Sequence, residues 1–189
     1  QLLRLPEAEV AARKTLEILR PYDRELADAK VFGRALAMLM TDQGQAGDAT
    51  TMMQAAYDRL KDVDGKPHSL RSAVTQTLAN IALARGDAQT ALRLAQRSRT
   101  ELRSRTHSVQ ASVLTLIARA AIEAGELKVA REAVAEARKI NSERGLPALS
   151  ARALAQVAAE LAALTGDRGG AEAEYAQLAQ RFPVDHAPQ

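Results

Sequence analysis

The chain has 189 residues, no cysteine and a net charge of +3, the balance of 26 basic and 23 acidic side chains. Hydrophobic residues make up 47% of it and charged residues 26%, which is typical of a folded chain and excludes general disorder. The lack of cysteine excludes disulfides and thiolate chemistry, and the near balance of charge gives no electrostatic indication of a nucleic-acid partner.

Composition also indicates the class of secondary structure. The strong helix formers Ala, Leu, Arg, Glu and Gln dominate, whereas aromatic residues make up only 3% of the chain. Helices with so few large side chains gain burial by approaching one another closely. We therefore expect an all-α protein of about nine helices. In chain order they are predicted over 2–20, 23–43, 48–61, 69–84, 88–98 with an extension to 105, 108–124, 126–144, 148–164 and 168–181.

A repeat connects these helices in pairs. Four glycines recur at intervals of 42, 39 and 41 residues, with an aliphatic or alanine pair eight and seven residues before each and an alanine five residues after it. A period of this length with helix–turn–helix content predicts a solenoid of helical hairpins. The glycines are Gly44, Gly86, Gly125 and Gly166, the preceding pairs Leu36-Ala37, Leu78-Ala79, Ile117-Ala118 and Ala158-Ala159, and the following alanines Ala49, Ala91, Ala130 and Ala171.

The residues around the turns predict how the helices end and begin. Glycine ends a helix well because it adopts a positive φ without steric penalty. Asp87, directly after Gly86, is placed to cap the helix that follows. Ser69 and Ser108 each follow a histidine and are expected as further N-caps.

This pattern resembles the tetratricopeptide repeat. The repeat of 39–42 residues is longer than the family's usual length of about 34 and is similar to the longer variants in kinesin-light-chain-like repeats and in sensor arms of bacterial signal-transduction regulators. Pro183 matches the proline that often ends the family's second helix, and Tyr175 matches one consensus aromatic. The clearest copy of the motif is formed by Leu78, Ala79, Ala82, Gly86, Ala91 and Ala95.

The resemblance implies a single repeat domain over 1–189 that forms a right-handed superhelix of antiparallel hairpins. We expect a half-repeat helix at 1–21, the second half of a repeat whose first half would precede it. The hairpins are predicted over 22–62, 68–105, 107–144 and 147–183, and the tail 184–189 is expected to fray.

In the family that the chain resembles, the first helices of the hairpins line a concave groove that binds a partner. Asn80 and Arg119 are the strongest candidates here, because amide and guanidinium side chains bind peptide backbone and carboxylate groups. The family's carboxylate-clamp subgroup also uses lysines in this groove, and no lysine matches in this chain. The positions that match the groove-lining spacing are Arg34, Met38, Gln76, Asn80, Leu83, Thr115, Arg119, Glu123, Gln156 and Glu160.

The sequence contains no catalytic, cofactor-binding or metal-binding motif, so we expect neither an enzyme nor a cofactor. His68, His107 and His186 are the three histidines, and the first two occupy equivalent loops where a structural role at helix starts is the simpler interpretation. The segment 93–105 carries five arginines against Glu101. Because no aromatic residue is interleaved for base stacking, a solvated outer helix face is favoured over an anion or nucleic-acid contact.

The predicted function is a protein–protein interaction module, a scaffold or regulatory domain of a larger bacterial protein. Its partner would be a peptide segment or helix of another protein, or another domain of the parent chain. The alternative is a sensor arm of a transcription regulator or signal-transduction protein that binds a small effector or a signalling peptide. Self-association through exposed repeat ends is a third interpretation.

The expected location is the cytoplasm. The longest stretches without a charged residue are 72–84 and 106–118, both shorter than the roughly 18 residues that a membrane span requires. The absence of cysteine fits the reducing cytoplasm, and a periplasmic location would fit it equally.

Overall fold

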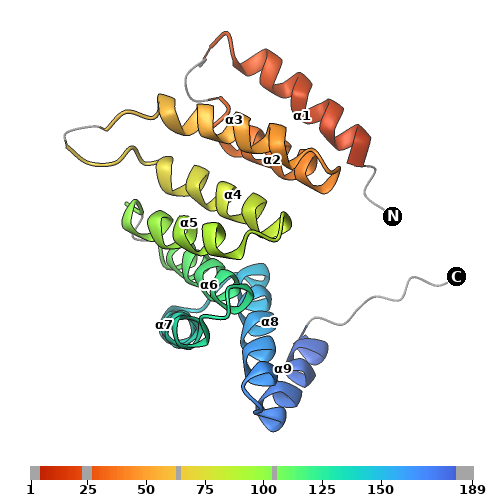
Figure 1. The fold of residues 1–189 in the computed structure, drawn as a ribbon, viewed down its shortest axis with the longest axis vertical. Coiled ribbons are helices and arrows are strands. Elements are labelled where there is room, and N and C mark those ends of the chain that lie inside the picture. Colours follow the sequence, from red (N-terminus) through yellow and green to blue (C-terminus); the bar gives the residue numbers. More distant parts are fainter. Residues whose placement is uncertain (1–4, 23–26, 63–64, 104–105, 182–189) are drawn as a thin grey trace, which may run out of the picture. The chain divides into compact units, whose positions relative to one another are not determined.

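A computed structural model of the protein describes residues 5–22, 27–62, 65–103 and 106–181. Within these residues the chain forms nine α-helices (Figure 1). The bounds of α8 and α9 are those predicted, and the other helices except α2 differ from prediction by a few residues. The helices are α1 (Leu5–Leu19), α2 (Val31–Asp42), α3 (Ala46–Arg59), α4 (Arg71–Ala84), α5 (Ala88–Thr100), α6 (His107–Glu123), α7 (Leu127–Arg144), α8 (Ala148–Leu164) and α9 (Arg168–Arg181).

The helices divide between two compact units, Gln1–Ser104 with α1–α5 and Arg105–Gln189 with α6–α9. In unit 1, α2 pairs with α3 and α4 with α5; in unit 2, α6 pairs with α7 and α8 with α9. The helix α1 packs on α2 (Figure 1). The predicted fold class, an all-α solenoid of antiparallel helical hairpins, is confirmed.

Each hairpin has a first helix (α2, α4, α6 or α8) and a second helix (α3, α5, α7 or α9). The first helices of successive hairpins contact each other, α2 with α4 in unit 1 and α6 with α8 in unit 2. Within the described residues, α3 and α5 do not make such backbone contact, and neither do α7 and α9. In each unit the first helices therefore pack on each other, whereas the second helices are separated.

The four hairpin turns have the same backbone geometry, which explains the glycine period. The turn glycines have φ between 74° and 83°, a region that strains other residues. In each turn the residue after the glycine donates its N–H to the carbonyl five residues earlier at 2.8–2.9 Å, the Schellman arrangement. As predicted, the Asp87 carboxylate accepts the Thr90 N–H at 3.2 Å, and Asp167 caps α9 in the same way.

The repeated small residues occupy the interior of the hairpins. The four alanines that follow the turn glycines are 0–7% exposed, and the four pairs before the glycines are also 0–7% exposed. Because an alanine carries only a methyl group, the two helices can approach closely beside the turn. The register predicted from the sequence is therefore confirmed.

Replacing Ala91 with leucine is expected to destabilise unit 1 by roughly 1–3 kcal/mol. Ala91 is fully buried where α5 leaves its turn, so three added carbon atoms would force α4 and α5 apart. Urea unfolding followed by circular dichroism measures the loss. Ala88→Leu, at a partly exposed position of the same helix, is the matched control, and an equal stability of both variants would contradict the register.

The start of α2 is the largest departure from the prediction. A helix was expected from residue 23, but α2 begins at Val31 and residues 27–30 form a turn; residues 23–26 lie outside the described part. The buried Asp28 carboxylate accepts hydrogen bonds from Arg20 at 3.0 Å and from Arg59 at 3.2 Å. Gly33 lies directly against the Asp28 backbone. These tertiary contacts override the local helix propensity.

The predicted N-caps Ser69 and Ser108 are wrong. The cap residue of α4 is Leu70. His68 binds the backbone at this helix start: its carbonyl accepts the Arg71 N–H at 2.9 Å, and its Nδ1 accepts the Leu70 N–H at 3.1 Å. The cap residue of α6 is Thr106.

Three further predictions concern the ends of α5 and of the chain. The extension of α5 to residue 105 is wrong, since the helix ends at Thr100. His186 and the tail 184–189 lie outside the described residues.

Candidate functional site

The ten predicted groove residues divide between the two units, five on helices of each. Arg34 and Met38 on α2 stand at the same distances from their turn glycine as Gln76 and Asn80 on α4, and α2 contacts α4. With Leu83 these four residues form what we call the α2–α4 face of unit 1. The second group, which we call the α6–α8 face of unit 2, consists of Thr115, Arg119, Glu123, Gln156 and Glu160.

The α2–α4 face is partly exposed and largely uncharged. All five of its side chains are half-buried, although most of their neighbours on α4 are buried. Asn80 donates from Nδ2 to the Gln76 carbonyl at 3.0 Å, and Gln76 donates from Nε2 to the Ser72 carbonyl at 3.3 Å. These bonds use amide N–H groups, so no hydrogen bond among the described residues occupies the side-chain carbonyl oxygens of Gln76 and Asn80.

Arg34 is the one charged member of the α2–α4 face. Its Nε is buried and has no hydrogen-bond partner in the described part of the protein. Burial lowers the pKa of the Arg34 guanidinium, because removing a cation from water disfavours the charged form. An arginine in this setting retains unused capacity to bind an anion.

The α6–α8 face differs in charge and exposure. Thr115 is half-buried and donates its Oγ1 hydrogen to the Ala111 carbonyl at 2.8 Å. Arg119, Glu123, Gln156 and Glu160 are exposed. Both signs of charge are therefore available on this face, whereas the α2–α4 face offers one cation.

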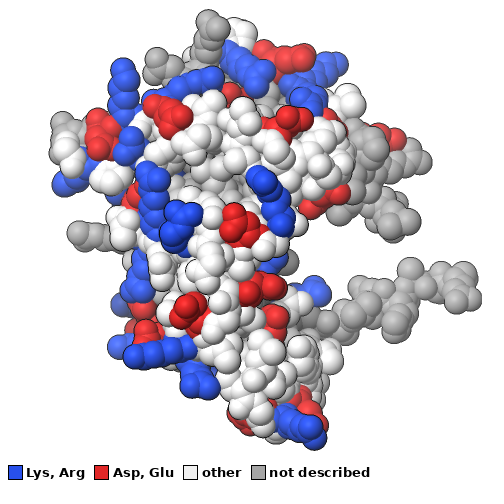
Figure 2. Space-filling view, viewed as in Figure 1, with Lys and Arg blue, Asp and Glu red and all other residues white. Residues whose placement is uncertain are grey.

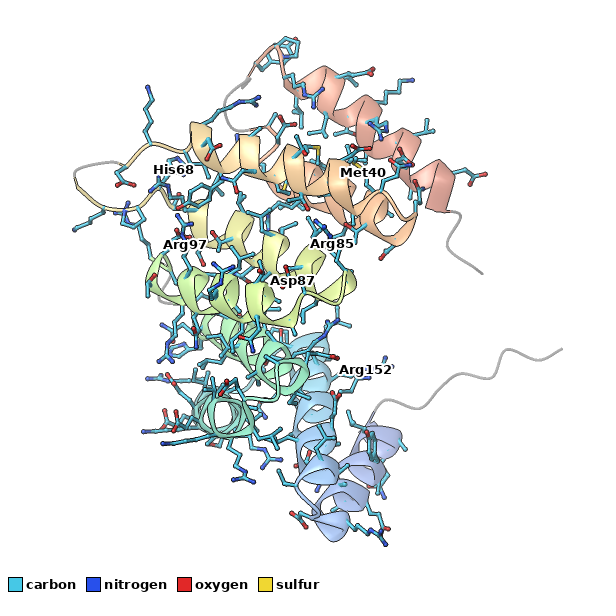
Figure 3. All side chains as sticks on the ribbon, viewed as in Figure 1. Met40, His68, Arg85, Asp87, Arg97 and Arg152 are labelled. Carbon is cyan, nitrogen blue, oxygen red and sulfur yellow. The ribbon has the colours of Figure 1, made fainter. Side chains whose placement is uncertain are left out.

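A buried polar cluster in unit 1 has no counterpart among the predicted sites. Glu101, 7% exposed at the end of α5, accepts hydrogen bonds from the Tyr57 hydroxyl at 2.5 Å, Thr75 Oγ1 at 2.6 Å and Arg97 Nε at 2.8 Å. Arg97, labelled in Figure 3, also donates to the Tyr57 hydroxyl oxygen. The guanidinium groups of Arg97 and Arg71 stack on the Tyr57 ring, 4.6 and 5.0 Å from its centroid. We call these five residues the Glu101 cluster.

The Glu101 cluster joins the second helices α3 and α5, whose backbones do not touch. Arg71 and Thr75 contribute to the cluster from the first helix α4, and Arg71 also binds the Leu60 carbonyl and Asp62. Because its members bind one another and other groups of unit 1, we interpret the cluster as structural.

Tyr57 was not predicted from the sequence. One sequence feature could have indicated the cluster. Glu101 is the single acidic residue of the arginine-rich segment, and a lone carboxylate among arginines is a candidate for a buried ion pair.

Stability is expected to fall at alkaline pH because of Tyr57. Burial, and next the hydrogen bond to Glu101, raise the pKa of the Tyr57 hydroxyl. Because the neutral hydroxyl is favoured in the folded state, its contribution to stability is complete below the pKa of tyrosine in the unfolded chain, about 10. The contribution is lost as the pH rises above that value towards the higher pKa of the folded state. Urea unfolding between pH 9 and about 11 should therefore show a smaller decline for Tyr57→Phe than for the unchanged protein. Tyr175→Phe, at a 52% exposed position, is the control and should keep the full decline.

The arginine-rich segment makes several contacts inside unit 1. Arg97 belongs to the Glu101 cluster, Arg93 donates to Thr90 Oγ1 at 2.9 Å, and Arg103 donates to the Pro67 carbonyl at 3.3 Å. Arg105 lies outside the described residues. On the face of unit 1 seen in Figure 2, basic and acidic side chains are interspersed around a wide uncharged area. A continuous basic surface is not visible there.

The two described histidines lie at the starts of α4 and α6. His68 accepts a backbone hydrogen bond, and His107 is the first residue of α6. In the part of the chain that the structure describes, no three His, Cys, Asp or Glu side chains are grouped so that they could hold a metal ion.

A small cavity of about 110 Å³ lies between α1 and the first hairpin of unit 1. Apolar side chains form part of its wall, among them Met40, labelled in Figure 3, and charged side chains of α1 form the rest. Pockets for small molecules usually measure about 300–1,000 Å³. Its lining residues are Arg13, Leu16, Glu17, Arg20, Leu36, Met40 and Met52.

The fold and these surfaces define an all-α protein built from repeated helical hairpins. No family model matches the chain, and no curated protein matches it. Among solved structures, the chain is similar to the crystal structure of BtubC (BKLC) from P. vanneervenii, with a TM-score of 0.73 and 14% sequence identity. The match covers 98% of this chain and 77% of BtubC. At this identity the similarity concerns the fold alone.

None of the described helices is both long and apolar enough to cross a membrane.

Proposed function

We propose that the protein is a tetratricopeptide-like interaction module that binds an extended segment or a helix of another protein on the inner sides of its units. The observation that supports this proposal most directly is the α2–α4 face. It combines half-buried apolar side chains with two amide side chains and an arginine whose buried Nε has no partner among the described residues. Groups of these kinds bind the side chains, N–H groups and acidic groups of a peptide.

The proposal includes a non-enzymatic role, as a scaffold or regulatory domain of a larger bacterial protein in the cytoplasm. The alternative role is a sensor arm of a transcription regulator or signal-transduction protein that binds a small effector or a signalling peptide. The cavity beside α1 is smaller than a usual small-molecule site, so it is not proposed as the effector site. Self-association is the third role. Val10 and Ile18 on α1 are 65% and 59% exposed and would form the contact between two copies. Light scattering, which measures the molar mass in solution, tests it.

Peptide selection tests the proposed function. A displayed library of random 12-residue peptides is selected on the protein, and the affinities of selected peptides are measured by fluorescence anisotropy. We expect binders, and a loss of about tenfold or more in affinity for the double variant Asn80→Ala/Arg119→Ala, because each substitution removes a polar group from one inner face.

The matched control removes the same chemical groups from second helices. Gln96→Ala/Arg131→Ala deletes one amide on α5 and one guanidinium on α7, both at exposed positions, and should bind as tightly as the unchanged protein. Failure to select any peptide, or equal losses for the two double variants, would contradict binding on the inner faces.

A further inference from the structure

The helix α1 belongs to none of the four hairpins, and among the described helices its backbone contacts α2 alone. Two of its described side chains are buried, Ala12 and Leu16, whereas the second helices α3 and α5 of the same unit bury four each. An element with few buried apolar contacts opens at a lower free energy than the rest of its unit. The attachment of α1 to unit 1 therefore depends on a small contact.

The surface beneath α1 is apolar and incompletely filled. It consists of Leu36 and Met40 of α2 and Met52 of α3, and we call these three residues the α1 seat. Leu16 joins the same hydrophobic core, but the cavity of about 110 Å³ remains beside it. Space without atoms removes dispersion contacts from the side chains around it. The packing of α1 on its seat is therefore weaker than that of a fully packed helix.

An ion pair ties the end of α1 to the rest of unit 1. Arg20, directly after α1, donates from Nη2 to Asp28 Oδ1 at 3.0 Å, and Arg59 at the end of α3 donates to Asp28 Oδ2 at 3.2 Å. We call the Arg20–Asp28 pair the latch. The Asp28 side chain is 9% exposed and that of Arg20 is 47% exposed. When the latch opens, Arg20 enters water and Asp28 keeps Arg59, so no buried charge loses its last partner.

We propose that α1 is exchangeable, and that the α1 seat of one copy also binds α1 of a second copy. A second copy brings the same Leu16 to the seat and the same guanidinium to Asp28, so the contacts within one chain are reproduced between two. Exchange of an identical element is a low-cost route to a closed, symmetric dimer. Because the chain's own α1 competes at an effective concentration of roughly millimolar, the dimer forms at high protein concentration.

Thiol labelling tests whether α1 leaves its seat. The chain has no cysteine, so Met40→Cys places a single thiol in the seat, and Met53→Cys places one at a fully buried position of the first hairpin. A maleimide larger than the cavity should label Met40→Cys at least about tenfold faster, because opening of α1 uncovers the seat and leaves the hairpin closed. Adding Arg20→Gln should accelerate the labelling of Met40→Cys alone. Equal rates for the two thiols would overturn the proposal.

A fluorescent peptide with the sequence of residues 5–22 tests binding by a second copy. It is added to the full chain, and anisotropy measures its affinity. We expect about fivefold tighter binding to the Arg20→Gln chain, whose own α1 has lost the latch while the peptide retains it. Arg13→Gln is the matched control, because Arg13 pairs at 2.6 Å with Glu9 of α1 itself, and this chain should bind the peptide like the unchanged one.

Variants of the peptide identify the side of α1 that binds. Leu16→Ser should abolish binding, since Leu16 is 1% exposed where α1 meets its seat. Val10→Ser/Ile18→Ser changes two exposed positions and should bind like the unchanged peptide. The reverse result would place self-association on the exposed side of α1 and overturn the exchange, and so would a peptide that binds neither chain. These outcomes leave the proposed function unaffected, because the α2–α4 and α6–α8 faces take no part in the exchange.

Discussion

Replacing Gly33 with alanine is expected to destabilise unit 1 by about 3 kcal/mol. A Cβ at this position would lie 2.2 Å from the Asp28 carbonyl oxygen and 2.5 Å from its Cα, far inside van der Waals contact. Both atoms belong to the backbone, so no side-chain rotation can relieve the clash. The turn 27–30 would have to move, and the ion pairs of Asp28 with Arg20 and Arg59 would be weakened.

Gly47→Ala is the matched control for this prediction. Gly47 also lies near the start of a helix, α3, but nothing stands within 4 Å of an added Cβ. Because alanine is the better helix former, this change should be neutral or stabilising by up to about 1 kcal/mol. Urea unfolding of both variants gives the comparison, and similar stabilities would mean that residues 27–30 are not held against α2.

Replacing Glu101 with alanine is the second change with a large expected effect, a loss of about 3 kcal/mol. Glu101 accepts hydrogen bonds from Tyr57, Thr75 and Arg97, and its removal leaves buried donors without an acceptor. The loss remains below that for a fully enclosed ion pair, because water still reaches the 53% exposed Arg97 side chain.

The control and a second variant identify the cause of this loss. Glu132→Ala, at an exposed position of α7, should change the free energy of unfolding by less than about 0.5 kcal/mol. Tyr57→Phe combined with Glu101→Ala should cost less than the sum of the two single changes, since the partners share one network. Additive losses would show that the two residues act independently.

The sequence predicted the parts of the fold that depend on neighbouring residues. Gly86 and Asp87 determine a turn through their own conformational preferences, and Ala91 is buried because it lies five residues beyond such a turn. The same pattern in three other copies made the hairpins predictable.

Features that depend on residues far apart in the chain were not predictable in this way. The late start of α2 requires Asp28 to meet Arg59, 31 residues away, and the Glu101 cluster requires Tyr57 to meet a residue 44 positions away. Helical periodicity contains no information on such pairs. For the candidate site, the spacing predicted Arg34 as a groove residue, but that its buried Nε has no partner among the described residues became visible only in three dimensions.

The shared geometry of the four turns has a consequence for how the protein folds. Each hairpin closes over a short loop, and the described helices contact only their neighbours in the stack. The entropy of closing long loops is therefore small, and chains with such local contacts usually fold fast. We expect hairpin formation to precede stacking, so that substitutions in the turns slow folding while the loss of Glu101 mainly accelerates unfolding.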